Sequence, residues 1–328
     1  MENRKDTKSV VEAGILSALI VVLVLFVQFV PVLGILGFFI LPIPVAVLYI
    51  KHGIKISVTA LVVCIIISCM VIGIINGIGF GVQYGLTGLA LGYCFKKQIK
   101  ESKSLLILSI ASMISYILVI ALNLLFINKA LFVDAINELV STMKKYAETS
   151  ISMSGSAISS DQANFIRDQI NNITVKSILT WIPAGIIMYS FVSAFINFIL
   201  TRSILKRLRF RVGELVPFDR VYIDNRIGAL MIISACLGII LQRYNIAAGD
   251  YIFNTALIVM NLTFNVIGAA LIYYFAKNRL RLTKAIAVLI TVGFFFMGGP
   301  LVFYIGFTDM IFDFRKVDPN RLFKSKVR

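Results

Sequence analysis

The chain has too little charge for a protein that folds in water. Only 15% of its 328 residues are charged, whereas 59% are hydrophobic. Soluble domains carry about 25% charged and about 45–50% apolar residues. The mean hydropathy is +0.92. A water-soluble globule and a disordered chain both need more polar residues than this, so the composition excludes them and predicts an integral membrane protein with several helices.

Residues that carry chemistry are equally sparse. The chain has one histidine, His52, and its four cysteines form no C-x-x-C pair: Cys64, Cys69, Cys94 and Cys236. All four lie in or beside apolar runs, so we expect small buried residues and exclude a disulfide scaffold. No G-x-x-x-x-G-K-[ST] phosphate-binding loop occurs, and no carboxylate sits in the middle of an apolar run. We therefore expect no enzyme, no catalytic or metal site, no cofactor, and no ATP hydrolysis by this chain.

Nine apolar runs organise the sequence. They cover residues 10–30, 33–50, 54–75, 78–95, 105–127, 178–201, 227–241, 251–276 and 285–312. A membrane-spanning helix needs about 20 apolar residues, which most of these runs approach or exceed. The first run has no small-residue cleavage site, so we expect it to remain as a membrane helix. The runs predict an all-α, polytopic transmembrane helical bundle with about 8–10 membrane segments.

The charges are unequal in sign, with 32 Lys and Arg against 16 Asp and Glu. If the N-terminus is cytoplasmic, 20 of the 32 basic residues fall in predicted cytoplasmic segments, as the positive-inside rule expects. The excess of positive charge therefore indicates orientation in the bilayer, and we expect no nucleic-acid partner.

The basic C-terminal tail fits this orientation only if the last run is not a single crossing. Nine simple crossings would leave the six basic residues of the tail outside the cell. The run is interrupted at Gly298-Gly299-Pro300, where proline removes a backbone donor and glycine permits a sharp turn. We expect a hairpin of two short helices that returns the tail to the cytoplasm. The alternative is one kinked span.

The only long polar stretch between runs covers residues 128–176. Apolar residues recur there at helical spacing, and Ser159 with Gln162 matches a capping box. A serine-rich loop over 150–160 is expected to separate two amphipathic helices outside the cell, the alternative being a mobile external loop. The predicted parts of the chain are N-terminal helices (1–127), this extracellular insertion (128–176), C-terminal helices (177–314) with a basic cytoplasmic loop (202–226), and the basic tail (315–328).

Polar side chains inside the runs repeat at helical intervals on three faces. The faces are Asn76, Gln83 and Thr87; Ser190, Ser193, Asn197 and Thr201; and Asn254, Asn261 and Asn265. Burying an unpaired amide in hydrocarbon is costly, so the faces should point into the bundle. They form either helix–helix hydrogen bonds or a pocket for a small uncharged or zwitterionic molecule. The candidate binding residues are Asn76, Gln83, Thr87, Asn197, Asn261 and Asn265.

Small residues mark two further faces. One is formed by Gly77, Gly81 and Gly85, and the other by Ala13, Gly14, Ser17 and Ala18. Small side chains let another helix approach closely. Both faces therefore predict packing within the chain or contact with a partner membrane protein.

Five short motifs carry a family resemblance. They are Glu12-Ala13-Gly14-Ile15-Leu16-Ser17-Ala18-Leu19, Leu41-Pro42-Ile43-Pro44, His52-Gly53, Tyr84-Gly85-Leu86-Thr87-Gly88-Leu89-Ala90-Leu91-Gly92-Tyr93 before Lys96-Lys97, and Asp309 with Asp313-Phe314-Arg315-Lys316. In these motifs and their order, the chain resembles the YybS-like family of uncharacterised bacterial membrane proteins. The resemblance covers nearly the whole chain and implies a multi-pass protein of the bacterial cell membrane.

Over roughly the first two hundred residues, that family is similar to the substrate-binding S components of energy-coupling-factor vitamin transporters. The likeness implies a six-helix bundle that binds a vitamin or a metal from outside. It also implies a membrane coupling protein with separate ATPases, docked at Ala13 and Ser17. The sequence thus favours small-molecule transport, or substrate binding for a transporter. The alternative is a non-transporting scaffold or regulator that recruits cytoplasmic partners through 202–226 and the tail.

Overall fold

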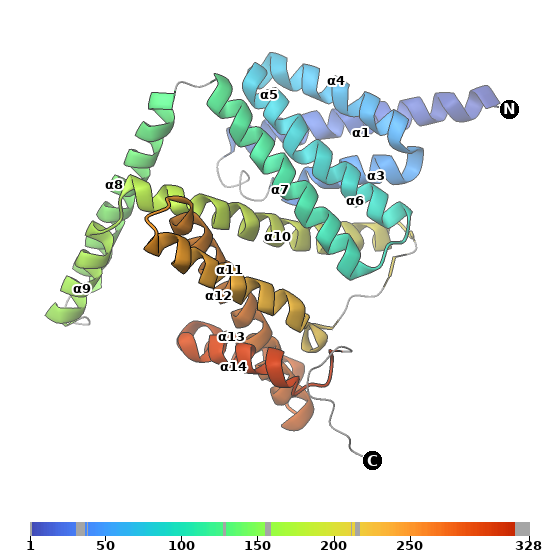
Figure 1. The fold of residues 1–328 in the computed structure, drawn as a ribbon. Helices are drawn as coiled ribbons and strands as arrows, with labels where there is room; N and C mark the ends of the chain where they lie inside the picture. Colours follow the sequence, from blue (N-terminus) through green and yellow to red (C-terminus); the bar gives the residue numbers. More distant parts are fainter. Residues whose placement is uncertain are drawn as a thin grey trace. The chain divides into compact units, whose positions relative to one another are not determined.

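The computed structural model describes residues 2–30, 37, 39–126, 129–154, 159–210, 212–213 and 217–318, and the regular elements within these ranges are all helical. The first elements, blue to green in Figure 1, are α1 (Glu2–Phe29), α3 (Pro42–His52), α4 (Ile54–Ile72), α5 (Ile74–Phe80), the π-helix η1 (Gly81–Gly85), α6 (Leu86–Lys96) and α7 (Glu101–Phe126). Two helices of the predicted insertion follow, α8 (Lys129–Ser154) and α9 (Ser160–Asn171).

The remaining elements extend from α10 to α14. They are α10 (Val175–Arg207), the 3₁₀ helix η3 (Phe218–Arg220), α11 (Asn225–Arg243), α12 (Ala248–Tyr274), the π-helix η4 (Phe275–Arg279), α13 (Lys284–Met297) and α14 (Pro300–Phe312). The predicted all-α class is confirmed.

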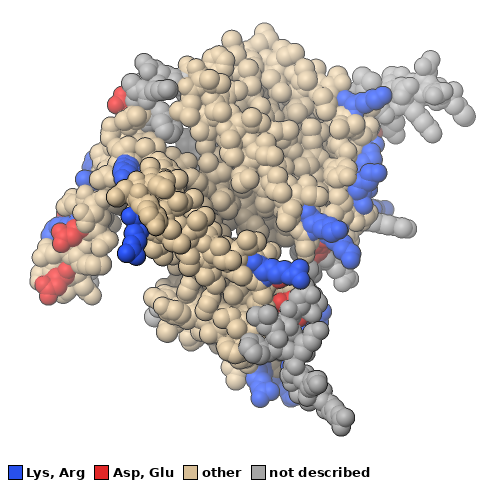
Figure 2. Space-filling model, in the orientation of Figure 1, with Lys and Arg blue, Asp and Glu red and all other residues tan. Residues whose placement is uncertain are grey.

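Seven helices in the described ranges are long and apolar enough to cross a membrane. They are Val11–Phe29, Ile54–Ile72, Ile74–Lys96, Glu101–Phe126, Val175–Arg207, Asn225–Arg243 and Ala248–Arg279. On the face shown in Figure 2, charged residues form small groups separated by broad uncharged surface. Such helices imply a lipid bilayer around them, so the prediction of a multi-pass membrane protein is confirmed.

Two of the predicted runs do not form one straight spanning helix. The described part of the run at 33–50 contains α3, which is 11 residues long and therefore about 16 Å, roughly half of the hydrocarbon core. The run at 285–312 forms α13 and α14, which are bent by 111° at the predicted glycine–proline break. The break is confirmed, whereas the side of the membrane on which the tail lies stays a prediction.

The helices divide into two compact units. Unit 1 contains Met1–Leu179 and Tyr189–Gly213, and unit 2 contains Thr180–Met188 and Glu214–Arg328. The division falls within α10, whose C-terminal part belongs to unit 1. Membrane helices α1, α4, α5–α6 and α7 therefore lie in unit 1 together with the short helix α3.

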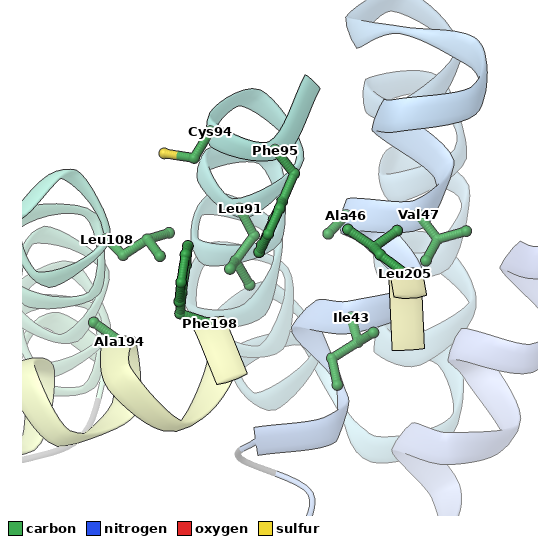
Figure 3. Close-up of a cluster of buried hydrophobic side chains, with 10 residues drawn as sticks. All are labelled: Ile43, Ala46, Val47, Leu91, Cys94, Phe95, Leu108, Ala194, Phe198 and Leu205. Atoms are coloured by element: carbon green, nitrogen blue, oxygen red, sulfur yellow. The ribbon is translucent and has the colours of Figure 1, made fainter. Parts of the chain in front are cut away.

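The largest apolar cluster of unit 1 joins α3, α6, α7 and the C-terminal part of α10 (Figure 3). Its centre is a stacked pair of rings, Phe95 of α6 and Phe198 of α10, whose centroids are 4.9 Å apart. Leu91, Leu108 and Leu205 pack around this pair and are almost completely buried. Apolar burial of this kind fixes the part of α10 that carries the predicted Ser190–Thr201 polar face.

The glycines of the fourth run allow close helix packing, as predicted. A β-carbon on Gly77 would lie 2.5 Å from the backbone nitrogen of Cys69, and one on Gly81 or Gly85 would overlap Ile65 or Leu61 of α4. These glycines therefore bring α5 and η1 against α4.

The small residues of α1 divide between two sides of the helix. Ala13 packs with Leu48 and Ala60, and the carbonyl of Ser17 accepts a hydrogen bond from the Cys64 thiol at 3.5 Å. Gly14 and Ala18 are exposed. Ala13 and Ser17 therefore pack within unit 1, where α3 and α4 cover them, which agrees with the helix-packing alternative for this face.

The insertion forms two helices, and its predicted capping box is present. The Ser159 hydroxyl accepts from the Gln162 amide and the Gln162 side chain accepts from the Ser159 amide, both at 3.2 Å. The predicted loop start at residue 150 is wrong, because α8 continues to Ser154. Hydroxyl groups there donate to carbonyls one turn earlier, such as Ser154 to Ser150 at 2.7 Å, and so remain compatible with a helix. Residues 155–158 lie outside the described ranges, and the extracellular position stays a prediction.

The cysteines are unpaired, as predicted. Cys64 and Cys94 are buried, but Cys236 on α11 is exposed. Cys69 is only half-buried, so the prediction that all four are buried is wrong for Cys69 and Cys236. An outward-facing position on a membrane helix meets lipid, which accommodates a small apolar side chain equally well.

Unit 2 is built around α12. Phe264 of α12 is fully buried and packs edge-to-face on Phe303 and Phe307 of α14, with centroid distances of 5.3 and 5.4 Å. One helical turn further, Gly268 of α12 faces Gly306 of α14 so closely that a β-carbon on Gly306 would overlap the carbonyl oxygen of Phe264. This contact between two backbones fixes α14 against α12.

Candidate functional site

A polar cluster lies inside unit 1, at the meeting of η1, α6, α7 and α10. It is formed by Gln83, Tyr84, Thr87, Ser112, Tyr116, Tyr189 and Ser193. These side chains enclose a cavity of about 10 Å³, enough for about one water molecule. The predicted candidates Gln83 and Thr87 are thus brought together with the polar face of α10. Tyr116, Tyr189 and Ser112 complete the site but did not stand out in the sequence.

Two tyrosines form the centre of this cluster. The rings of Tyr116 and Tyr189 are 4.3 Å apart between centroids. The Tyr189 hydroxyl has side-chain hydrogen-bonding contacts with Gln83, Ser193 and Tyr116, and thereby links three helical segments. The Thr87 hydroxyl instead donates to the backbone of its own helix, at 2.8 Å from the Gln83 carbonyl oxygen. The amide of Gln83 and the tyrosine hydroxyls are therefore the groups best placed to bind a ligand.

The polar face of α10 continues this cluster along the helix. Ser190, Ser193, Asn197 and Thr201 are all at least 96% buried, which confirms that the face points inward. Asn197 donates to the Ser193 hydroxyl at 3.1 Å. Its amide oxygen is buried without a hydrogen-bond partner in the described part of the chain, and so is the Thr201 hydroxyl. An unpaired polar atom inside a membrane bundle is costly, so these atoms indicate a place where a polar group is expected.

Asn76 does not join this cluster, although its spacing predicts a shared face with Gln83 and Thr87. It is exposed and donates to the Ile72 carbonyl oxygen of the preceding turn at 3.1 Å. The cause is the π-helix η1, which lies between Asn76 and Thr87. A π-turn has i→i+5 hydrogen bonds and so inserts an additional residue, which breaks the 3.6-residue periodicity. Asn76 is therefore not a residue of this site.

The third predicted face forms a local pair in unit 2. Asn265 donates to the side-chain oxygen of Asn261 at 2.9 Å, and Asn261 itself is exposed. Asn254 donates to the hydroxyl of Thr180 at 3.4 Å, within the same unit. The prediction that the whole face points inward is wrong for Asn261, because these asparagines satisfy one another or the nearby backbone without burial.

Unit 2 also holds a buried ion pair that the spacing of its two residues does not predict. The Asp309 carboxylate and the Arg315 guanidinium are 2.8 Å apart, with side chains only 3% and 1% exposed. Arg315 also donates to the carbonyl oxygen of Asp219 at 3.1 Å. The ion pair therefore connects the end of α14, the start of the C-terminal segment and η3.

Asp313 holds the adjoining backbone. It has a left-handed conformation with φ of +46°, and its carboxylate accepts from the amides of Val317 and Asp318 at 2.8 and 3.1 Å. Nearby, burial raises the pKa of the Tyr222 phenol, and the carboxylates of Asp318, Asp224 and Asp313 raise it further. The first part of the basic tail is therefore a folded element of unit 2.

These contacts bear on the alternative prediction that the loop 202–226 and the tail recruit cytoplasmic partners. Arg202 donates to the Gly213 carbonyl oxygen at 2.8 Å, and Arg315 is enclosed by its ion pair. Both side chains stabilise the chain itself, and Arg315, with its side chain 1% exposed, is not accessible to a cytoplasmic partner. Within the described ranges, no group of three or more His, Cys, Asp or Glu residues is arranged to hold a metal ion.

Comparison with known proteins agrees with the family resemblance. The family model described as "Predicted membrane protein (DUF2232)" matches residues 18–310. The uncharacterized protein YybS of Bacillus subtilis (strain 168) is 22% identical over 297 residues, which cover 88% of this chain and 91% of that protein. No solved structure matches. The predicted YybS-like relationship is confirmed, and the chain belongs to the DUF2232 family of predicted membrane proteins.

Proposed function

We propose that unit 1 binds a small uncharged or zwitterionic molecule for transport across the membrane. The observation that carries this proposal is the buried, unpaired amide oxygen of Asn197, one turn from the polar cluster around Gln83 and Tyr189. Neutral donors and acceptors in an apolar surrounding are typical of sites that fix the orientation of small ligands. The absence of charged groups among the cluster residues favours an uncharged or zwitterionic ligand.

The cluster in this structure corresponds to a closed state of the proposed site. Its cavity of about 10 Å³ is far smaller than the roughly 300 Å³ or more typical of ligand pockets. A ligand would therefore have to separate α10 from α6 and α7. The π-helix η1 lies directly beside the cluster, and π-turns are frequent at functional sites because they leave helical hydrogen bonds less regular.

The arrangement of unit 1 supports a role like that of an S component. In the described residues, its membrane part consists of α1, α4, α5–α6, α7 and the C-terminal part of α10, together with the short helix α3. A chain of this kind would have no ATPase of its own and would rely on a membrane coupling protein with separate ATPases. Since Ala13 and Ser17 are covered, the exposed Gly14 and Ala18 of α1 would form the contact surface. The helices α8 and α9 would cover the entrance from outside.

Ligand-induced stabilisation of the purified protein tests this function. We expect at least one member of a panel of vitamins and nucleobases to raise the unfolding free energy by about 2.7 kcal/mol when present at 100 times its Kd. The measurement is the temperature at which the detergent-solubilised protein loses its monodisperse gel-filtration peak. If no neutral or zwitterionic compound changes this temperature, or if only charged compounds do, the proposed function is wrong.

A further inference from the structure

An apolar groove lies in unit 2 between α12, η4, α13 and α14. Its volume is about 510 Å³, and its walls include Phe275, Leu280, Ile290, Phe294, Ile305 and Phe314. Among the described residues that line the groove, the only hydroxyl belongs to Thr308, which donates to the Tyr304 carbonyl oxygen at 2.9 Å and is thereby satisfied within its own helix. The groove therefore offers no free polar group along its length and suits a hydrocarbon chain.

The chain segment that contributes Leu280 to this groove is basic. The segment from Lys277 to Lys284 contains four basic residues and no acidic residue. Arg279 and Arg281 directly flank Leu280 of the groove wall, and both are exposed. Neither arginine side chain has a hydrogen bond or an ion pair in the described part of the chain, whereas the Lys277 ammonium lies 3.8 Å from the Asp219 carboxylate. Two exposed arginines without side-chain partners in the described ranges thus adjoin a residue of the apolar wall.

The local backbone explains this arrangement. The π-helix η4 ends with a hydrogen bond from the Leu280 amide to the Phe275 carbonyl oxygen at 2.9 Å. Arg281 then adopts a left-handed conformation with φ of +53°, which reverses the chain before α13 begins at Lys284. The turn places Leu280 on the groove wall, and the two arginines are its immediate neighbours in the chain.

We propose that this groove binds one anionic phospholipid, with an acyl chain along the apolar wall and the phosphate at Arg279 and Arg281. An acyl chain would fill the apolar groove, and a negatively charged headgroup would pair with Arg279 and Arg281 beside it. Basic pockets between membrane helices on the cytoplasmic side are suited to anionic headgroups, and the 277–284 segment is on the predicted cytoplasmic side. Ordinary surrounding lipid would show no such preference for charge.

Native mass spectrometry of the full-length protein released from detergent tests the proposal. Phosphatidylglycerol and phosphatidylcholine with the same acyl chains are titrated separately, and glycerol 3-phosphate serves as a headgroup without a chain. We expect one retained phosphatidylglycerol and no comparable retention of phosphatidylcholine or glycerol 3-phosphate. Replacing both arginines (Arg279→Gln with Arg281→Gln) should weaken phosphatidylglycerol binding about thirtyfold, since each basic residue near a headgroup contributes about fivefold.

The matched control removes two positive charges elsewhere on the predicted cytoplasmic side, in Arg207→Gln with Arg209→Gln. This variant should retain the lipid as the unmodified protein does. A second variant, Thr308→Trp, fills the groove and should abolish binding of the diacyl lipid while leaving the arginines intact. Equal retention of the two lipids, equal loss in the control variant, or binding of glycerol 3-phosphate as tight as that of the lipid would each overturn the proposal.

Discussion

Replacing Arg315 with methionine is expected to lower the free energy of unfolding by about 3–5 kcal/mol, because it leaves the Asp309 carboxylate buried without its partner. The guanidinium is 1% exposed and lies 2.8 Å from the carboxylate. Reversible unfolding in mixed detergent micelles measures the effect. The exposed neighbour Lys316 provides the control, and Lys316→Met should change the free energy by no more than about 0.5 kcal/mol.

A double variant separates the loss of the ion pair from a simple loss of volume. Asp309→Leu combined with Arg315→Met replaces both charges with apolar groups, and substitutions of this kind are often close to neutral. We expect the double variant to recover at least half of the unfolding free energy lost in Arg315→Met alone. A double variant as unstable as the single one would show that the carboxylate is not the source of the cost.

Adding a single methyl group at Gly306 is expected to cost about 3 kcal/mol, at the upper end of the usual range for overpacking. The β-carbon of Gly306→Ala would overlap the Phe264 carbonyl oxygen and lie 2.7 Å from the Gly268 amide nitrogen, and a backbone cannot move aside as a side chain can.

The same substitution at Gly293 is the control for this prediction. Gly293 lies within α13, and a β-carbon there would meet nothing within 4 Å. Because alanine favours a helix by about 1 kcal/mol over glycine, Gly293→Ala should be neutral or stabilising. Equal unfolding free energies for the two variants in micelles would contradict a close backbone contact between α12 and α14.

The membrane helices were predictable because their signal is strong and local. An apolar stretch of spanning length has few alternatives to a helix, since every backbone group must be hydrogen-bonded inside the bilayer. The break between α13 and α14 was predictable for the same reason, because Gly298, Gly299 and Pro300 act on the backbone directly. The short length of α3 was not predictable from the sequence. Pro42 and Pro44 are compatible with the first turn of a helix as well as with a kink in a longer one.

The candidate site was only partly predictable. The buried face of α10 follows from regular spacing, which survives because no irregular turn occurs between Ser190 and Thr201. Asn76 was misplaced because the sequence does not show where a helix changes from α to π at Gly81. Tyr116 and Tyr189 were missed because each is a single amphipathic side chain in an apolar run, and only the tertiary fold brings them together.

The Asp309–Arg315 pair illustrates a further limit. Arg315 follows Asp309 by six positions, a spacing that does not place the two side chains on one helical face. They meet because the helix ends at Phe312 and Asp313 turns the backbone with a positive φ. The sequence marks the end of the apolar run but does not show this reversal, so Arg315 was counted only among the basic residues of the tail.

Calorimetric titration of the compound that stabilises the protein, into purified unmodified protein and two amide variants, tests the central proposal most directly. Gln83→Leu alters the polar cluster, whereas Asn76→Leu alters an exposed amide on the same membrane helix and serves as the control. We expect Gln83→Leu to raise the Kd at least about tenfold, as expected for a lost hydrogen bond of about 1.5 kcal/mol, and Asn76→Leu to leave it unchanged. An unchanged Kd in folded Gln83→Leu, or an equal rise in both variants, would contradict a ligand site in the polar cluster of unit 1.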